Sequence, residues 1–186
     1  MGRLVVVIFG LMGTGKTTLA RALGAALKFP AIHSDAVRKH LAGMAPTALA
    51  PLEFGKGIYA EDFSARTYAE MRRLAAAPLA AGGSVILDAS FKRVQERVLV
   101  QELAREHGAR VVWVYCQCEP QVVKERLGIR LTNLQAISNG RVELLEAQAR
   151  DFDPLRPQDQ PLLRLNTGRE LAVVLEELKS FVQNFF

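Results

Sequence analysis

The chain alternates apolar runs with longer segments in which apolar residues recur every three or four positions. The apolar runs are rich in β-branched residues, which is typical of strands buried on both faces of a sheet. They predict strands at 4–9, 31–33, 84–87, 110–116 and 162–166. The amphipathic segments predict helices at 16–27, 36–41, 58–81, 91–107, 120–127 and 141–150, and a closing helix that ends near Phe186. Strands that alternate with helices indicate a parallel sheet with helices on both of its faces.

Glycine and proline residues divide these elements. Residues 10–15 predict a glycine-rich turn between the first strand and the first helix. Residues 43–57 contain two prolines and three glycines and show little periodicity, which predicts a mobile loop. Pro78 is expected to kink or break the helix at 58–81, because proline lacks the N–H that a helix interior needs. The sequence Thr-Gly-Arg-Glu at 167–170 fits a capping box before the closing helix.

Composition narrows the class of protein. With 186 residues, of which 49% are apolar, the chain is long enough for one domain (residues 1–186) with its own core. Its two cysteines, Cys116 and Cys118, are only two positions apart and cannot easily bridge each other, so we expect free thiols and a reducing, cytoplasmic location. The longest apolar run, residues 4–12, is too short to span a membrane. A net charge of +5 favours anionic ligands in general and does not single out nucleic acid.

The turn after the first strand carries the clearest chemical signal. Its sequence at 10–17, GLMGTGKT, matches the phosphate-binding P-loop pattern G-x-x-x-x-G-K-[ST]. The glycines let consecutive backbone N–H groups face a phosphate, and the following helix N-terminus adds partial positive charge. Lys16 would reach the β- and γ-phosphates, and the Thr17 hydroxyl would bind Mg²⁺. The ATP contacts expected in this segment are Gly10, Leu11, Met12, Gly13, Thr14, Gly15, Lys16, Thr17 and Thr18. The alternative is a glycine-rich turn without a ligand.

Other functional classes fit the sequence less well. The chain has no N-K-x-D motif for guanine recognition, which argues against a GTPase, and it is too short for a AAA-type motor with a helical lid domain. The Cys-Gln-Cys sequence at 116–118 lacks a second pair of ligands, so we expect no zinc site. The three histidines, His33, His40 and His107, are scattered and fit neither a catalytic triad nor a metal-binding spacing.

Three further segments are similar to parts of small kinases. Asp35 and Arg38 look like the D-x-x-R that small P-loop kinases carry after their second strand. The sequence VILDASF at 85–91 is similar to the "hydrophobic-D-A-T-F" segment of polynucleotide kinases. Arg126 and Arg130 resemble the R-x-x-x-R lid of nucleoside-monophosphate-type kinases. These motifs specify phosphoryl transfer better than they specify an acceptor.

From residue 4 to about 154 the chain resembles the AAA-type P-loop kinases that are often fused to aminoglycoside phosphotransferase domains. Their wider relatives include zeta toxins, gluconate kinases and polynucleotide kinases. The resemblance implies an α/β P-loop NTPase fold of three layers, with a five-stranded parallel sheet in the order 2-3-1-4-5. It also implies that residues 43–57 form an acceptor-side loop and that residues 126–140 form a lid region. Ser138 and Asn139 stand where a Ser-Asp pair is expected, so an ion pair that closes the lid would be missing.

The resemblance also implies roles for individual residues. Asp35 would orient the acceptor hydroxyl and accept its proton, and Arg38 would hold the acceptor. Asp88 would hold Mg²⁺ through a water at the sheet edge where α/β proteins bind ligands, and Asp35 could share that metal. Arg126 would stack on adenine, and Arg130 would reach the transferring phosphoryl group. Plainer interpretations stay open: a helix cap for Asp35, a turn residue for Asp88 and solvated side chains for the arginines.

We therefore expect an ATP-dependent phosphotransferase that moves the γ-phosphoryl group of Mg-ATP to a hydroxyl of a small molecule. The expected catalytic residues are Lys16, Asp35, Arg126 and Arg130, the substrate-binding residues are Asp35 and Arg38, and the metal ligands are Thr17 and Asp88. A polynucleotide 5′-hydroxyl kinase is the alternative, for which base-stacking aromatics would be needed; the candidates are Phe54, Tyr59, Phe63 and Tyr68. A third possibility is a nucleotide-dependent binding module without transfer.

Overall fold

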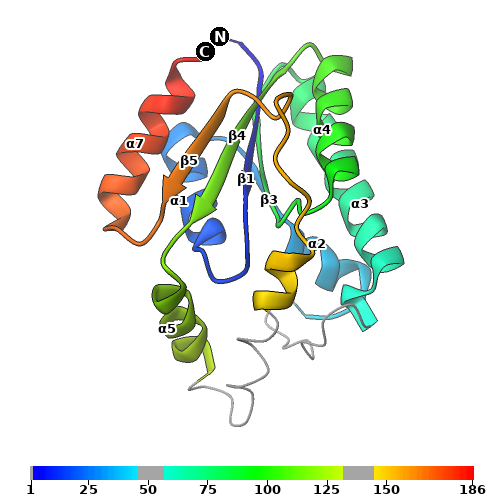
Figure 1. Cartoon of the computed structure of the whole chain (residues 1–186). Coiled ribbons are helices and arrows are strands. Elements are labelled where there is room, and N and C mark those ends of the chain that lie inside the picture. Colours follow the sequence, from blue (N-terminus) through cyan, green and yellow to red (C-terminus); the bar gives the residue numbers. More distant parts are fainter. Residues whose placement is uncertain (1, 46–56, 132–144) are drawn as a thin grey trace.

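The computed structural model describes residues 2–45, 57–131 and 145–186. Its centre is a five-stranded parallel sheet in which the strands lie in the order β2-β3-β1-β4-β5 (Figure 1). The strands are β1 (Leu4–Phe9), β2 (Ala31–His33), β3 (Val85–Asp88), β4 (Arg110–Gln117) and β5 (Leu162–Asn166). The predicted order 2-3-1-4-5 is confirmed.

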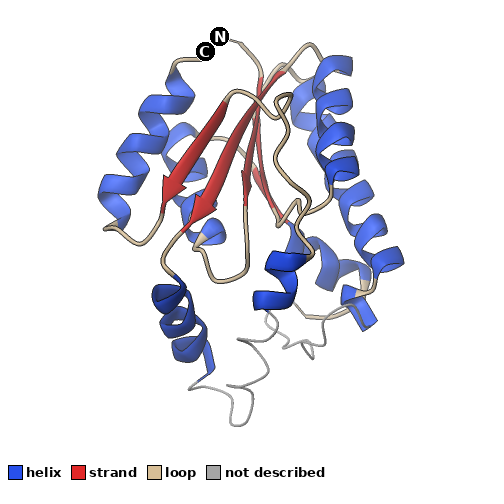
Figure 2. Cartoon of the chain, viewed as in Figure 1, coloured by secondary structure: helices blue, strands red, loops and turns tan. Residues whose placement is uncertain are grey.

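Helices cover both faces of the sheet and complete three layers (Figure 2). One face packs against α1 (Lys16–Leu27) and α7 (Leu171–Gln183), and the other against α3 (Glu61–Ala80) and α4 (Val94–Glu106). The remaining helices lie toward the carboxyl ends of the strands: α2 (Ser34–Leu41), the short 3-10 helix η1 (Gly57–Tyr59), α5 (Pro120–Leu131) and the helical residues 145–150.

The central strand β1 shows why the sheet is so apolar. All of its residues are 0% exposed. Its odd-numbered side chains enter the core beneath α3 and α4, and its even-numbered side chains enter the core beneath α1 and α7. Successive side chains of a strand point to opposite faces, so a strand covered on both sides needs an unbroken apolar run.

Two helices depart from their predicted bounds because of single residues. The expected break at Pro78 is wrong, since α3 continues to Ala80. Pro78 lies in the last turn of α3, where it removes one intrahelical hydrogen bond, and the residue after it, Leu79, is completely buried. α4 begins at Val94 instead of 91, because Phe91 is fixed at a φ of 43°, outside the helical region, with its ring buried.

Two further differences concern the elements around the turn at 10–17. α5 passes through Gly128 and ends at Leu131, beyond the predicted end at 127. The capping box at 167–170 is wrong, because Glu170 is the N-cap residue of α7 and no side chain caps that helix. The Thr167 hydroxyl instead donates a hydrogen bond to the Thr14 carbonyl at 2.7 Å.

The carboxyl ends of the strands meet at one edge of the sheet, and both termini of the chain lie at the opposite edge (Figure 1). The turn after β1, Asp88 at the end of β3 and the start of α2 after β2 all belong to the carboxyl edge. This is the edge at which α/β sheets bind ligands. Within the described ranges, no helix combines the length and apolarity that crossing a bilayer requires.

Candidate active site

The P-loop leaves β1 through glycines that no other residue could replace without strain. Gly10, Gly13 and Gly15 have φ values of 138°, 74° and 80°, in the region that favours glycine. A Cβ at Gly10 would lie 2.4 Å from the Cys116 carbonyl oxygen, so the loop passes tightly against the end of β4. Gly15 is the N-cap residue of α1 and provides no side-chain cap, which leaves the first N–H groups of α1 for a ligand.

The Lys16 side chain turns back over this loop. Its Nζ donates a hydrogen bond to the Leu11 carbonyl at 2.7 Å, and the Thr14 hydroxyl donates to the same carbonyl at 2.8 Å. The ammonium group therefore lies within the curve of the loop, beside the backbone that would surround phosphates. A lysine at this place in the motif is the residue that contacts β- and γ-phosphates in P-loop proteins, and Lys16 would be that residue here.

Asp88 receives hydrogen bonds from two neighbouring elements. Its Oδ2 accepts from the Thr17 hydroxyl at 2.7 Å and from His33 Nδ1 at 2.8 Å. Asp88 is 3% exposed, so both contacts form where water competes little. The strand register explains the cluster, because His33 pairs with Asp88 across β2 and β3 and Ile8 pairs with Asp88 across β1 and β3.

Sequence reasoning missed His33, which it treated as one of three scattered histidines. A usable signal was present: β2 and β3 both end in a polar residue, and neighbouring parallel strands bring their carboxyl ends together. Identifying the pair required the knowledge that β2 and β3 are neighbours and that their last residues are in register.

The pair formed by Thr17 and Asp88 fits a magnesium ion. A hydroxyl and a carboxylate are hard oxygen donors, and Mg²⁺ in nucleotide sites usually takes one or two protein ligands together with waters and phosphate oxygens. Thr17 Oγ1 and Asp88 Oδ2 are already 2.7 Å apart, at the N-terminal turn of α1. These two residues would hold the metal beside the P-loop.

Asp35 and Arg38 follow β2 on α2 but have very different surroundings. The helix begins at Ser34, with His33 as its N-cap residue and no side-chain cap, so the helix-cap interpretation of Asp35 is not supported. The Asp35 side chain is 60% exposed and forms an ion pair with Lys39 at 2.8 Å. A carboxylate at the start of α2 is thus open to a ligand.

Arg38 is 8% exposed and connects α2 to the neighbouring elements. Its Nη1 donates to the Ile58 carbonyl and to the Ser64 hydroxyl, and its guanidinium lies 5.0 Å from the centre of the Tyr59 ring. Burial lowers the pKa of Arg38, while Tyr68, Tyr59 and Asp35 act in the opposite direction. The contacts of this side chain therefore hold α2 against η1 and α3.

Arg126 lies at the rim of the P-loop. Its Nη2 donates to the Thr167 carbonyl at 2.7 Å, and a Cβ added at Gly15 would lie 3.3 Å from its Nη1. The Thr167 hydroxyl donates to the Thr14 carbonyl at 2.7 Å, so Arg126, the β5–α7 turn and the P-loop form one connected group. Sequence reasoning read Thr167 as a helix cap and missed this contact.

Several predicted site features lie outside the described residues. They are positions 46–56 of the loop at 43–57, positions 132–140 of the lid region, the Ser138-Asn139 sequence and the Arg130 side chain. The backbone of Arg130 belongs to α5. Of the remaining predicted residues, the structure brings Lys16, Thr17 and Asp88 into one cluster, with Arg126 beside it.

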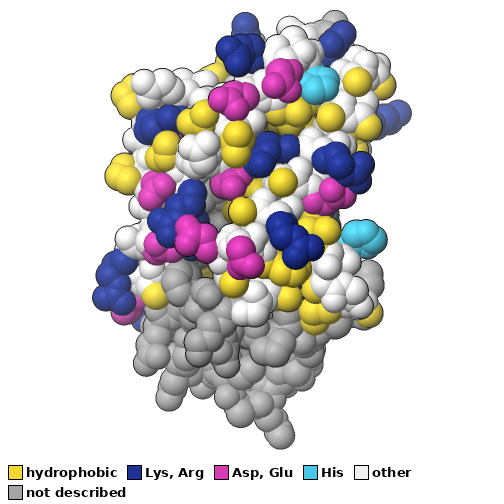
Figure 3. Space-filling model, turned by 90° about the vertical axis from the view of Figure 1, so that its right-hand side faces the viewer, with side chains coloured by type: hydrophobic (Ala, Val, Ile, Leu, Met, Phe, Trp, Pro, Cys, Tyr) yellow, Lys and Arg dark blue, Asp and Glu magenta, His cyan; other side chains and the backbone are white. Residues whose placement is uncertain are grey.

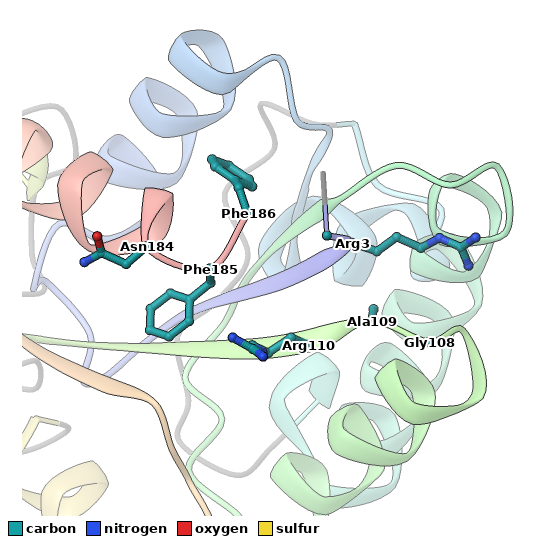
Figure 4. A pocket seen from close by; sticks show the side chains of 8 residues that line it. Arg3, Gly108, Ala109, Arg110, Asn184, Phe185 and Phe186 are labelled. Atoms are coloured by element: carbon teal, nitrogen blue, oxygen red, sulfur yellow. The ribbon is translucent and has the colours of Figure 1, made fainter.

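A separate hollow of about 500 Å³ lies at the other edge of the sheet, near the chain termini (Figure 4). Arg3, Arg110, Phe185 and Phe186 are among the residues that line it. None of the predicted site residues is among them. The chemistry predicted from the sequence is therefore at the carboxyl edge, and this hollow is independent of it.

Solved structures share this fold at low sequence identity. A gluconokinase from Sinorhizobium meliloti matches with a TM-score of 0.65 at 22% identity, covering 98% of this chain and 94% of that one. The APS kinase CysC of Mycobacterium tuberculosis, solved in complex with AMPPNP and APS, matches with a TM-score of 0.64 at 18% identity, covering 98% of each chain. These likenesses establish the fold of P-loop kinases.

Sequence comparison identifies the family. An uncharacterized protein of Mycobacterium tuberculosis, Rv2004c, is 28% identical over 149 residues, which are 80% of this chain and 30% of that relative. The chain thus matches less than a third of the length of the longer protein. The family described as AAA domain matches residues 5–155. This chain therefore belongs to the AAA domain family, and its fold is that of the P-loop kinases.

Proposed function

We propose that the protein is a kinase that transfers the γ-phosphoryl group of Mg-ATP to a hydroxyl of a small molecule. One observation carries this proposal: the Thr17 hydroxyl of the P-loop helix lies 2.7 Å from the Asp88 carboxylate at the end of β3. These two residues would be the protein ligands of a nucleotide-bound magnesium ion. Lys16, the residue before Thr17, supplies the cation for the phosphates.

The reaction requires positioning and neutralisation of charge more than covalent help from the protein. The acceptor oxygen forms a bond to the γ-phosphorus, the bond from that phosphorus to the bridging oxygen breaks, and ADP leaves. Lys16 and the N–H groups of the P-loop stabilise the negative charge on the phosphate oxygens. When bound, Mg²⁺ would neutralise part of the negative charge on the phosphates. Arg126 would face the nucleotide from the rim of the loop.

Asp35 is proposed to act on the acceptor. Its carboxylate is 60% exposed at the first turn of α2, two residues after His33, which contacts Asp88. A carboxylate in this position can orient a hydroxyl and accept its proton as the new bond to phosphorus forms. Lys39 Nζ lies 2.8 Å from Asp35 Oδ2, so this carboxylate has a cationic neighbour on its own helix.

The surroundings of Asp35 favour a small acceptor over a nucleic acid. A nucleic acid would need exposed aromatic rings for stacking. Tyr68 is 7% exposed, with its hydroxyl bonded to Ser90 and Phe91, and Tyr59 and Phe63 lie beneath Arg38 and Arg66. Phe54 lies outside the described residues.

The charges on the outer face of α3 and α4 also favour a small acceptor over a nucleic acid. Figure 3 shows basic and acidic side chains interspersed over that face. Two of its arginines are engaged in ion pairs, Arg72 with Glu96 at 2.5 Å and Arg73 with Glu70 at 2.7 Å. A polyanion binds best along a continuous basic surface, which this face does not offer.

The test measures ADP formation from Mg-ATP with a panel of acceptors: sugars, gluconate, shikimate, nucleosides, aminoglycosides and 5′-hydroxyl oligonucleotides. We expect one class of small molecule to raise ADP formation well above the rate with water alone. Lys16→Ala should abolish that increase, and Lys124→Ala, at an exposed position of α5, is the matched control. Stimulation by oligonucleotides alone would identify a polynucleotide kinase, and nucleotide binding without turnover would favour a binding module.

A further inference from the structure

One peptide unit of the P-loop, between Leu11 and Met12, is held from both of its polar ends. Its carbonyl oxygen accepts hydrogen bonds from Lys16 Nζ at 2.7 Å and from the Thr14 hydroxyl at 2.8 Å. Its N–H, on Met12, donates to the side-chain oxygen Oε1 of Gln148 at 2.7 Å. The partner that fixes the N–H end is thus a residue that no motif in the sequence identifies.

Gln148 reaches the loop from far along the chain, 136 residues after Met12. It belongs to the helical residues 145–150, which are held at the P-loop by apolar contacts. Leu145 is 9% exposed and packs in a small core with Val123 and Leu127 of α5, against which Leu11 and Met12 of the loop also pack. This small apolar core therefore holds the helical residues 145–150, and with them Gln148, next to Met12.

The hydrogen bond to Gln148 constrains the lysine through the geometry of the peptide. A trans peptide unit is planar, with its C=O and N–H pointing in opposite directions. Holding the Met12 N–H therefore also sets the direction of the Leu11 carbonyl, which is the acceptor for the Lys16 ammonium. Without an acceptor for the N–H, this part of a glycine-rich loop could rotate and carry the carbonyl away from the lysine.

We propose that Gln148 is a positioning residue for phosphate binding. Its amide oxygen holds the Leu11–Met12 peptide unit so that the Leu11 carbonyl keeps the Lys16 ammonium at the mouth of the P-loop. The inference rests on the proposed function in one respect, that the phosphates of a nucleotide bind at this loop. A neutral amide suits the role, because a carboxylate there would place negative charge beside the phosphates.

The experiment compares nucleotide affinities by isothermal titration calorimetry. Gln148→Met keeps the approximate length of the side chain but replaces its polar amide, which contains the acceptor oxygen, by an apolar thioether. Glu146→Gln, at an exposed neighbouring position, is the matched control. We expect Gln148→Met to weaken ADP binding by up to about tenfold, the upper end of what one hydrogen bond between neutral groups contributes at a part-buried site. AMP, which has no β-phosphate for Lys16 to contact, should lose less than twofold, and the control should bind both as the wild type does.

A double-mutant cycle separates this role from a merely structural one. If Gln148 acts through Lys16, then Gln148→Met should cost less than twofold in ADP affinity when Lys16 is already replaced by alanine. Equal losses in the two backgrounds, or a lower melting temperature with unchanged ADP affinity, would overturn the proposal. If Gln148→Met fails to fold, Gln148→Asn, whose shorter amide cannot reach Met12, serves in its place. ADP affinity can be measured whether or not the protein transfers phosphoryl groups, so failure of the proposed function is seen separately.

Discussion

Asp35 and Asp88, the two carboxylates of the proposed site, have opposite surroundings. Asp88 is 3% exposed and accepts hydrogen bonds from Thr17 and His33, whereas the Asp35 side chain is 60% exposed and is paired with Lys39. A buried carboxylate with fixed donors suits a metal of fixed geometry, and an exposed one suits an acceptor that enters and leaves. Substituting each by asparagine tests this division.

Asp35→Asn should lower kcat by about 10²–10⁴-fold, the usual contribution of a positioned base, and leave ADP affinity nearly unchanged. The loss should be equal in kcat and kcat/KM, as expected for an interaction made in the transition state. Asp88→Asn should instead weaken nucleotide binding and raise the Mg²⁺ concentration needed for half-maximal rate. Steady-state kinetics and calorimetry measure both, with Asp62→Asn on the exposed first turn of α3 as control. Weakened Mg-ATP binding in Asp35→Asn would place Asp35 among the metal ligands instead.

Because the thiol of Cys116 is buried, we expect the folded state to become less stable at high pH. Cys116 is 1% exposed, and burial raises the pKa of its thiol to about 12. A thiol in the unfolded chain has a pKa of about 8.5, so above that pH the unfolded state loses the proton and the folded state keeps it. Folding stability should therefore fall as pH rises from about 8.5 towards 12. Urea unfolding between pH 7 and 10.5 should show a steeper decline for wild type than for Cys116→Ala, and a decline of equal slope would contradict the assignment.

At the scale of elements, Arg38 connects α2, η1 and α3 through one buried guanidinium. Arg38→Ala removes its hydrogen bonds and leaves the Ile58 carbonyl without this donor. We expect the free energy of unfolding to fall by about 2 kcal/mol and the melting temperature by roughly 4–8 °C. Arg21→Ala, at an exposed position of α1, should change the melting temperature little. An unchanged melting temperature in Arg38→Ala, together with a raised KM for the acceptor, would make Arg38 a substrate ligand and not a structural one.

Strands, helices and motifs were predictable from the sequence where all the residues that identify them lie in one continuous segment. The apolar run at 4–9 and the motif at 10–17 could be read directly, and the strand order followed from the resemblance to kinases. Residues whose role depends on contacts between distant segments were missed. His33 matters because of the register of β2 with β3, and Thr167 and Gln148 matter because tertiary packing brings them to the P-loop. The positive φ of Phe91, whose side chain is buried, is likewise a feature that sequence periodicity does not report.

At the scale of the molecule, nucleotide binding should stabilise the whole fold, because the site joins β1, β3, α1, α5 and the β5–α7 turn. A ligand that binds only the folded state at a hundred times its Kd adds about 2.7 kcal/mol to the free energy of unfolding. ATP should therefore raise the melting temperature, and Mg²⁺ should increase that rise. GTP should protect less, since the sequence has no motif for guanine recognition. Differential scanning fluorimetry measures all three, and equal protection by GTP would contradict adenine selectivity.

The position of the two chain termini on the parallel sheet also determines where a label or a sensor surface can be joined to the protein. Both chain termini lie at the edge of the sheet opposite the P-loop, near the hollow lined by Arg3 and Phe186 (Figure 1). A fluorescent label, a biotin or a sensor surface joined to either end would thus sit on the far side of the molecule from the nucleotide. Immobilisation through the N-terminus and through the C-terminus should give the same ATP affinity by surface plasmon resonance, and both should equal the affinity measured in solution.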